Sequence, residues 1–176
     1  MARTDEEKRE MFLGKSSRYI LKVIEEIRKI SKTLATPGSH VMGLSSSIKV
    51  LLDDMIMVHP IKIEFQEEGI DEEKIDKKLQ LDIFRIVQEQ LNNILKHSKA
   101  THASIHLTRN EDEIDLLISD NVEGCDILKE NGGMGILNIK SRAESNHGVV
   151  TIISKPGEGY ELNVVLPLHA HSSLKI

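Results

Sequence analysis

The sequence contains a single cysteine, no tryptophan, and only 3% aromatic residues. A lone cysteine, Cys125, excludes an internal disulfide and is typical of a reducing compartment. Few aromatic rings and a formal net charge of −5 argue against a nucleic-acid surface, which needs a basic patch and stacking side chains. We therefore expect no nucleic acid among the partners of this protein.

Long apolar runs are also missing from the sequence. No stretch approaches the roughly 20 apolar residues of a membrane-spanning helix, and the first residues, MARTDEEKRE, lack the apolar centre of a secretory signal. We expect a cytoplasmic location without membrane contact, as part of either a membrane-anchored or a soluble protein. The 176 residues, 39% apolar and 29% charged, suffice for one globular domain plus an appended element.

Two amphipathic helices are predicted in the N-terminal third. At 17–34, apolar residues recur at spacings of three and four in a seam close to a heptad repeat. This helix can pair in a bundle or pack on its own domain, and Pro37 and Gly38 end it. A second helix is predicted at 44–55, ending before His59, because a residue that precedes proline disfavours the helical conformation.

Alternating and helical patterns continue along the rest of the chain. The acidic stretch EEGIDEEK is typical of a solvated turn. The expected elements are strands at 61–66, 102–108, 113–119, 149–154 and 160–166, a helix at 77–97 and a short helix from about Gly135. Strands in antiparallel pairs beside helices predict an α+β fold, a two-layer sandwich of helices on a mixed sheet, with a long helix at its N-terminus.

The helix predicted at 77–97 has an apolar and a polar stripe. The apolar stripe, expected to face the core, comprises Phe84, Val87, Leu91 and Ile94. The polar stripe, on nearly the opposite side, comprises Glu89, Asn93 and Lys96, with His97 at its edge. Such a stripe could hold a hard cation and place a positive charge on a phosphate. A solvated face with ordinary charge pairs gives the same pattern, so both interpretations stay open.

Two loops add features of a ligand site. In the run ISDNVEGCD, Asp120 stands at a strand end and could accept a hydrogen bond from a ligand's amine, while Gly124 lets the backbone approach. A plain Asx turn would use the same residues. Gly133 and Gly135 precede or begin a helix, where backbone N–H groups can bind a phosphate.

Taken together, these segments resemble the motifs of sensor histidine kinases. IFRIVQEQLNNILKHSKATHASIHL resembles their N-box, in the subgroup similar to nitrate sensors and the membrane-fluidity sensor. ISDNVEGCD resembles the D-box, GGMGILNIKSRAE the G-box, and SKPGEGYELNVVLPL the closing strands. The resemblance covers about residues 60–168 and extends to the superfamily of ATPases shared by gyrase, Hsp90, histidine kinases and MutL.

The resemblance implies ATP and Mg²⁺ as ligands. Asn93 is similar to the family's Mg²⁺-ligating asparagine, and Glu89 to the catalytic acidic residue that orients the metal site or acts as a base. Asp120 resembles the aspartate that reads adenine. The nucleotide-binding residues implied in this way are Asn93, Lys96, His97, Asp120, Gly124, Gly133, Gly135 and Ile136.

The resemblance also implies a domain division and partners. Residues 1–38 resemble the second helix of the dimerisation and phosphotransfer hairpin, 39–59 a linker helix, 60–168 the ATP-binding catalytic domain and 169–176 a tail. None of the eight histidines precedes an acidic residue, as the phosphoacceptor motif requires, so the acceptor is expected on a helix outside this sequence. A response regulator and a second copy of the kinase, in a homodimer, are the implied partners.

One departure from the family pattern keeps other functions open. Val122 replaces the first glycine of the usual D-x-G-x-G, and Cys125 stands where an aromatic residue is common. Valine does not adopt positive φ without strain, so weaker nucleotide binding is expected. A non-catalytic interaction module with a degenerate ATP site is one alternative. An anti-sigma or serine-kinase-type ATPase is another, although the helix at 17–34 has no place in that fold.

Overall fold

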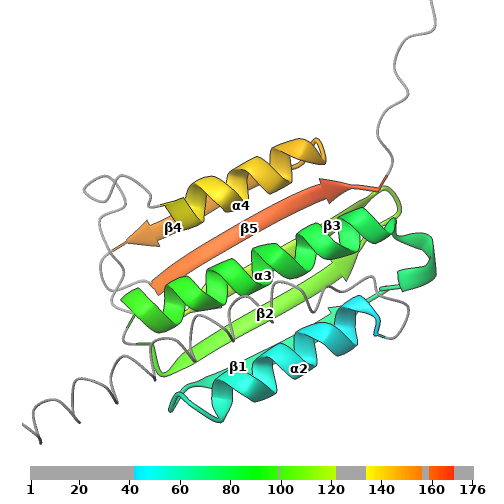
Figure 1. Cartoon of the computed structure of the whole chain (residues 1–176). Helices are drawn as coiled ribbons and strands as arrows, with labels where there is room; N and C mark the ends of the chain where they lie inside the picture. The colour runs from blue at the N-terminus through cyan, green and yellow to red at the C-terminus, as the bar shows by residue number, and fades with distance from the viewer. Residues whose placement is uncertain (1–41, 99, 122–133, 156–158, 169–176) are drawn as a thin grey trace, which may run out of the picture.

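The computed structural model describes residues 42–98, 100–121, 134–155 and 159–168. Within these ranges, three α-helices lie side by side on one face of a five-stranded sheet (Figure 1). The elements are α2 (Leu44–Ile56), β1 (Lys62–Glu68), the 3₁₀ helix η1 (Glu72–Lys74), α3 (Lys77–His97), β2 (His102–Arg109), β3 (Glu113–Asp120), α4 (Met134–Ser145), β4 (Val149–Lys155) and β5 (Gly159–Pro167). The predicted α+β sandwich is confirmed.

The predicted elements in these ranges agree with the structure to within about two residues. One difference is η1, which occupies part of the acidic stretch that was predicted as a turn. Its local i to i+3 bonds make it easy to miss, because a single 3₁₀ turn has no apolar periodicity. The helix predicted at 17–34 lies outside the described residues. No helix within the described ranges is long and apolar enough to span a membrane.

The sheet is mixed because one pair of neighbouring strands is parallel. The strand order is β1-β2-β3-β5-β4, with β1 and β2 parallel and every other neighbouring pair antiparallel. Parallel strands need a long connection, and here the chain between β1 and β2 contains α3. α3 therefore lies on the middle of the sheet, between α2 and α4 (Figure 1).

The core lies between the sheet and the three helices. Alternate residues of the central strands face it and are fully buried, namely Ile105 and Leu107 of β2, Ile114, Leu116 and Ile118 of β3, and Leu162, Val164 and Leu166 of β5. Their neighbours along each strand are only partly buried, which is the period of two expected for a sheet that is covered on one face.

Local hydrogen bonds fix the start of α3. The carboxylate of Asp76, the N-cap residue, accepts hydrogen bonds from the backbone N–H groups of Lys78 and Leu79 at 2.9 and 3.3 Å. The buried amide of Gln80 donates to the carbonyl groups of Glu72 and Ile75 at 2.7 and 2.9 Å. These bonds join η1 to α3 and set where the long helix begins on the sheet.

Candidate functional site

Three of the features singled out in the sequence lie at one end of the molecule. The C-terminal end of α3, the C-terminal end of β3 and the N-terminal end of α4 all lie toward the left of Figure 1. The described chain stops at this end at Asn121 and resumes at this end at Met134. A candidate site is thus formed by elements from distant parts of the sequence.

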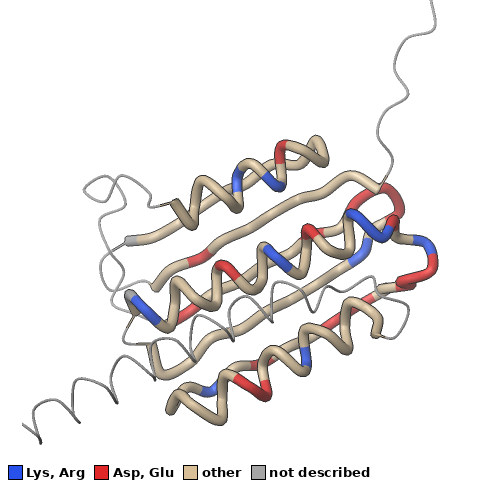
Figure 2. The backbone as a smooth tube through the Cα atoms, viewed as in Figure 1, with Lys and Arg blue, Asp and Glu red and all other residues tan. Residues whose placement is uncertain are grey.

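The polar stripe of α3 faces α4, whereas the sequence predicted that it would point away from the core. Glu89 and Asn93 are partly buried, and Lys96 is exposed. The reason is the central place of α3, which is covered by the sheet below and by a helix on each side. Figure 2 shows acidic and basic residues alternating along this helix.

Gly135, in the first turn of α4, lies directly against this stripe. A β-carbon at this position would lie 2.6 Å from Oε1 of Glu89 and 2.8 Å from Oδ1 of Asn93. Such distances are shorter than van der Waals contact, so a side chain at this position would require the carboxylate of Glu89 and the carboxamide of Asn93 to move. The structure therefore brings Glu89, Asn93 and Gly135 close together, and the resemblance had implied all three as residues of the candidate site.

Asn93 has a further property that fits a ligand site. Its Nδ2 atom is buried and has no hydrogen-bond partner among the described residues. A buried amide without a partner costs free energy, and native proteins keep few of them. The O and N atoms of a carboxamide can be exchanged by a flip, so the same position can offer an oxygen to a cation.

Asp120 occupies the end of β3. Its side chain faces inward and the residue is 8% exposed, between Ala103 of β2 and Tyr160 of β5 in register. The next residue, Asn121, fixes the strand end: its Oδ1 accepts hydrogen bonds from the N–H groups of Thr101 and His102 at 3.0 and 2.9 Å. The carboxylate of Asp120 is thereby held on a rigid strand.

The other predicted site residues are less informative. Ile136 is partly buried and packs against the core, and His97 is the last residue of α3. Gly124 and Gly133 lie outside the described residues, as do Val122 and Cys125.

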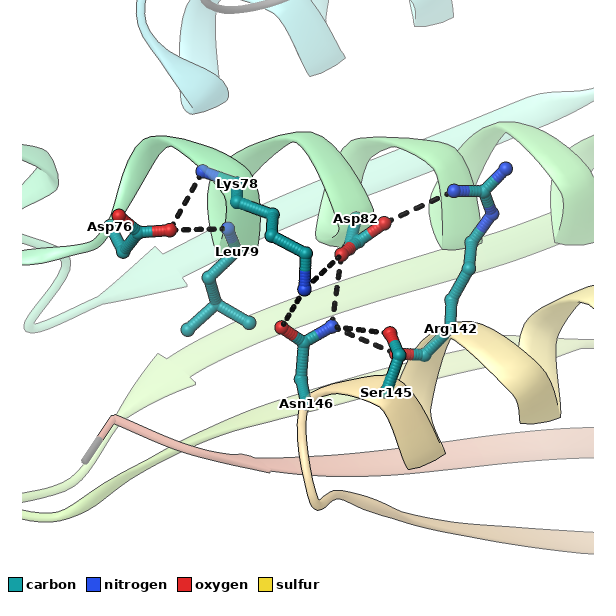
Figure 3. Close-up of polar contacts among 7 residues, drawn as sticks. All are labelled: Asp76, Lys78, Leu79, Asp82, Arg142, Ser145 and Asn146. Carbon is teal, nitrogen blue, oxygen red and sulfur yellow. Dashed lines mark hydrogen bonds and ion pairs between the residues drawn. The ribbon is translucent and has the colours of Figure 1, made fainter. Parts of the chain in front are cut away.

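Sequence reasoning missed a polar cluster between α3 and α4. Asp82 is only 7% exposed and accepts hydrogen bonds from Arg142 and Asn146 of α4 and its C-terminal turn (Figure 3). A signal was present, because Asp82 precedes Glu89 by about two helical turns and thus continues the same stripe. The partners on α4 could not be read from the sequence.

A cation at this site would depend on few protein ligands. Across the described ranges, no group of three or more His, Cys, Asp or Glu residues is arranged to hold a metal ion. The carboxamide of Asn93 and the carboxylate of Glu89 both lie against one glycine and are oxygen donors of the type that Mg²⁺ binds. These residues fit a cation that takes most of its ligands from phosphate oxygens and water.

Comparisons with known proteins agree with this geometry. The sequence profile of the family described as histidine kinase-, DNA gyrase B-, and HSP90-like ATPase matches residues 78–170. The sensor histidine kinase LiaS of Bacillus subtilis (strain 168) is 34% identical over 128 residues, or 72% of this chain and 34% of that protein. The sensor protein VraS of Staphylococcus saprophyticus is 32% identical over 149 residues, or 84% of this chain and 42% of that protein. The chain thus spans well under half the length of these curated relatives.

Solved structures share the fold. The histidine kinase domain of the Erythrobacter litoralis EL346 blue-light activated histidine kinase superposes with a TM-score of 0.57 at 17% identity, over 75% of this chain and 64% of that one. The ATP binding domain of PrrB from Mycobacterium tuberculosis superposes with a TM-score of 0.56 at 15% identity, over 73% of this chain and 96% of that one. At such low identity the likeness concerns the fold alone.

Proposed function

Because the chain belongs to the family of histidine kinase-, DNA gyrase B- and HSP90-like ATPases and aligns with sensor histidine kinases, we propose that it binds Mg-ATP at the end of α3 and supplies the γ-phosphoryl group to a histidine. The acceptor histidine belongs to a helix outside this sequence. The observation that carries the proposal is the contact of Gly135 with Glu89 and Asn93, because it joins the N-box and G-box segments in one site.

Each residue has a part in this proposal. Asn93 offers its carboxamide oxygen to the cation, and Glu89 orients the metal site or accepts a proton from the attacking histidine. Lys96, exposed one turn nearer the end of α3, places a positive charge beside the phosphates. When bound, Mg²⁺ neutralises charge on the triphosphate and so favours transfer of its terminal group.

The adenine end is assigned to Asp120. A carboxylate at a strand end, fixed by the hydrogen bonds of Asn121, can accept a hydrogen bond from the exocyclic amine of adenine. Gly124, Gly133 and Ile136 complete the proposed nucleotide site, together with His97. Membership of a family of ATPases supports this choice of nucleotide.

The proposed reaction is an in-line phosphoryl transfer. A ring nitrogen of the acceptor histidine attacks the γ-phosphorus, the bond from that phosphorus to the bridging oxygen breaks, and ADP leaves. The histidine loses its ring proton and becomes phosphohistidine. An aspartate of a response regulator then takes the phosphoryl group. Catalysis on this chain consists of positioning and charge stabilisation.

The proposed domain division and assembly follow the resemblance to sensor histidine kinases. Residues 1–38 form part of the dimerisation and phosphotransfer hairpin, 39–59 lead into the catalytic domain at 60–168, and 169–176 are a tail. In the full protein, two copies pair through the hairpins, on the cytoplasmic side of a membrane or in solution. The proposal also places the chain in the subgroup similar to nitrate sensors and the membrane-fluidity sensor.

ATP titration with and without Mg²⁺ tests the binding step. We expect calorimetry to show binding that is tighter in Mg²⁺ than in EDTA, and tighter for ATP than for GTP. An absence of binding under both conditions would refute the proposal and favour a non-catalytic module.

Phosphoryl transfer is tested with γ-labelled ATP. The 176-residue chain alone is expected to bind ATP without forming acid-labile phosphohistidine. Joining it to an upstream helix that carries a histidine followed by an acidic residue should produce label on that helix. Stoichiometric label on a histidine of the present sequence would contradict the assignment of the acceptor.

A further inference from the structure

The side-chain carboxylate of Asp82 connects α3 to α4 by charged hydrogen bonds (Figure 3). Arg142 donates to Oδ1 at 3.1 Å, and the amide of Asn146 donates to Oδ2 at 2.9 Å. Lys78 lies 3.9 Å from the same carboxylate, within ion-pair range. The side chain of Asp82 is 10% exposed and that of Arg142 is 41% exposed, so the pair is partly screened from water.

This contact and the contact of Gly135 are two ends of one helix pairing. On α3, Asp82 precedes Glu89 by about two turns, and on α4, Gly135 precedes Arg142 by about two turns. The helices therefore run antiparallel, with Arg142 beside Asp82 and Gly135 beside Glu89 and Asn93. Fixing one end sets where the other end lies.

Burial of apolar side chains alone does not fix the rotation of α4 or its position along α3. Ile139 and Ala143 are the residues of this helix that are fully buried, while Met134 and Leu137 in its first turns are 82% and 61% exposed. Burial of apolar surface is non-directional, so two buried side chains hold the helix down without setting its rotation or its position along α3. Charged hydrogen bonds have a preferred geometry and can set both.

We propose that Asp82 is a positioning residue of the nucleotide site: by binding Arg142 and Asn146 it seats Gly135 against Glu89 and Asn93. This inference rests on the proposed function, since the site that is positioned is the ATP site. It adds a residue about two turns from the proposed metal site that none of the family motifs singles out.

A nearby arginine makes the charge of Asp82 more important. The pKa of Arg85 is lowered from its usual value, first by burial and then by the positive charge of Arg142. The two guanidinium groups therefore repel each other, and Asp82 offsets this repulsion at Arg142. Neutralising Asp82 would remove the carboxylate that offsets this repulsion at Arg142 and weaken the attraction between the end of α4 and α3.

Three variants test the proposal. Asp82→Asn removes the charge and keeps the shape. The double variant Asp82→Asn with Arg142→Gln removes both charges. The control, Asp115→Asn, alters a hydrogen bond of the same chemistry at 2.7 Å to Asn163, in the sheet and away from α4. ATP affinity is measured in Mg²⁺ well below each melting temperature, and amide hydrogen exchange is measured at Ile139 and Lys140, one helical turn after Gly135 and Ile136, where the N–H groups have acceptors within α4.

The single charge variant should bind ATP on the order of tenfold more weakly than the parent, with faster exchange at Ile139 and Lys140. The double variant should recover part of that affinity, because the uncompensated charge is gone. The control should lose stability without losing affinity. If Asp82→Asn does not fold, Asn146→Ala, which removes one neutral donor, should show the same changes to a smaller extent.

A purely structural Asp82 would give a different result. The melting temperature of the variants would fall while ATP affinity and exchange at Ile139 and Lys140 equalled those of the parent, and the positioning role would be wrong. Failure of the positioning role can be distinguished from failure of the proposed function. The proposed function fails if the parent protein itself binds no ATP. In that case the exchange rates at Ile139 and Lys140 still decide whether Asp82 positions α4.

Discussion

Gly135 touches Asn93 so closely that a β-carbon on the glycine would lie 2.8 Å from the Oδ1 atom of the asparagine. The two residues are 42 positions apart in the sequence, and their contact defines the distance between α4 and α3 at the candidate site. A side chain at position 135 would push the helices apart or displace the polar stripe of α3.

Gly135→Ala is therefore expected to weaken Mg-ATP binding by roughly tenfold or more, since small displacements at a phosphate site are costly. The melting temperature should change little, because Glu89 is partly exposed and can move. Calorimetric titration and a thermal melt measure the two effects. Ser141→Ala, at an exposed position of the same helix, serves as the control and should leave both unchanged. Unaltered ATP affinity in Gly135→Ala would mean that nucleotide binding does not depend on the close approach of α4 to α3.

Asn93→Ala should abolish the difference in ATP affinity between Mg²⁺ and EDTA. The free energy of unfolding should change by less than about 1 kcal/mol, because the buried Nδ2 has no hydrogen-bond partner among the described residues and its removal relieves a cost. The adjacent Asn92 is a matched control on the same helix, and Asn92→Ala should keep the dependence on Mg²⁺. Equal behaviour of the two variants would remove Asn93 from the metal site.

Asp120→Asn should lower ATP affinity by roughly threefold to tenfold, because a charged acceptor makes a stronger hydrogen bond than a neutral one. Selectivity for ATP over GTP should fall at the same time. Competition titrations with the two nucleotides measure both quantities. Asp115→Asn, on the same strand, provides the comparison. Retained discrimination in Asp120→Asn would mean that another group reads the adenine.

His147→Gly is expected to stabilise the protein. His147 follows the end of α4 with a φ of 57°, in the left-handed region that costs an L-residue about 1 to 2 kcal/mol. Glycine avoids that cost but makes the unfolded chain more flexible. We expect a net gain of about 0.5 to 1 kcal/mol in urea unfolding.

A substitution of the neighbouring Gly148 is expected to have the opposite effect on stability. A β-carbon there would lie 2.5 Å from the carbonyl oxygen of Val165, so Gly148→Ala should destabilise. A loss of stability in His147→Gly would show that its side chain contributes more than its backbone costs.

Glu67→Gln should reduce stability at pH 7 but not at low pH. The pKa of Glu67 is lowered, chiefly by a hydrogen bond with Ser45 and also by Lys49, whose Nζ lies 2.9 Å from Oε1. A carboxyl group with a lowered pKa stabilises the folded state above its unfolded pKa of about 4.3, and this contribution is lost as the pH falls through the folded value.

The difference in urea midpoint between parent and Glu67→Gln should therefore be present at pH 7 and vanish near pH 3. Glu111→Gln, at an exposed position between β2 and β3, is the control for removing one acidic residue. A difference that persists at pH 3 would mean that the charge of Glu67 is not its source.

The sequence by itself determined most of the fold. Local patterns suffice for elements whose apolar residues repeat with a period of two or 3.6, which is why α3 and the five strands were predicted nearly to the residue. The resemblance of three segments to the N-box, D-box and G-box implied Glu89, Asn93, Asp120 and Gly135 as candidate site residues. A single 3₁₀ turn such as η1 carries no such pattern.

Only the tertiary structure decided how those residues meet. From the sequence, the polar stripe of α3 looked like its outer side, but a helix with neighbours on both flanks is buried over a wide arc, and the stripe faces α4. The contact of Gly135 with Asn93 and the bonds from Asp82 to Arg142 and Asn146 depend on how two helices are seated on one sheet. Periodicity within one element carries no information about its rotation against another, because that rotation depends on contacts between elements, such as those of Gly135 and Asp82.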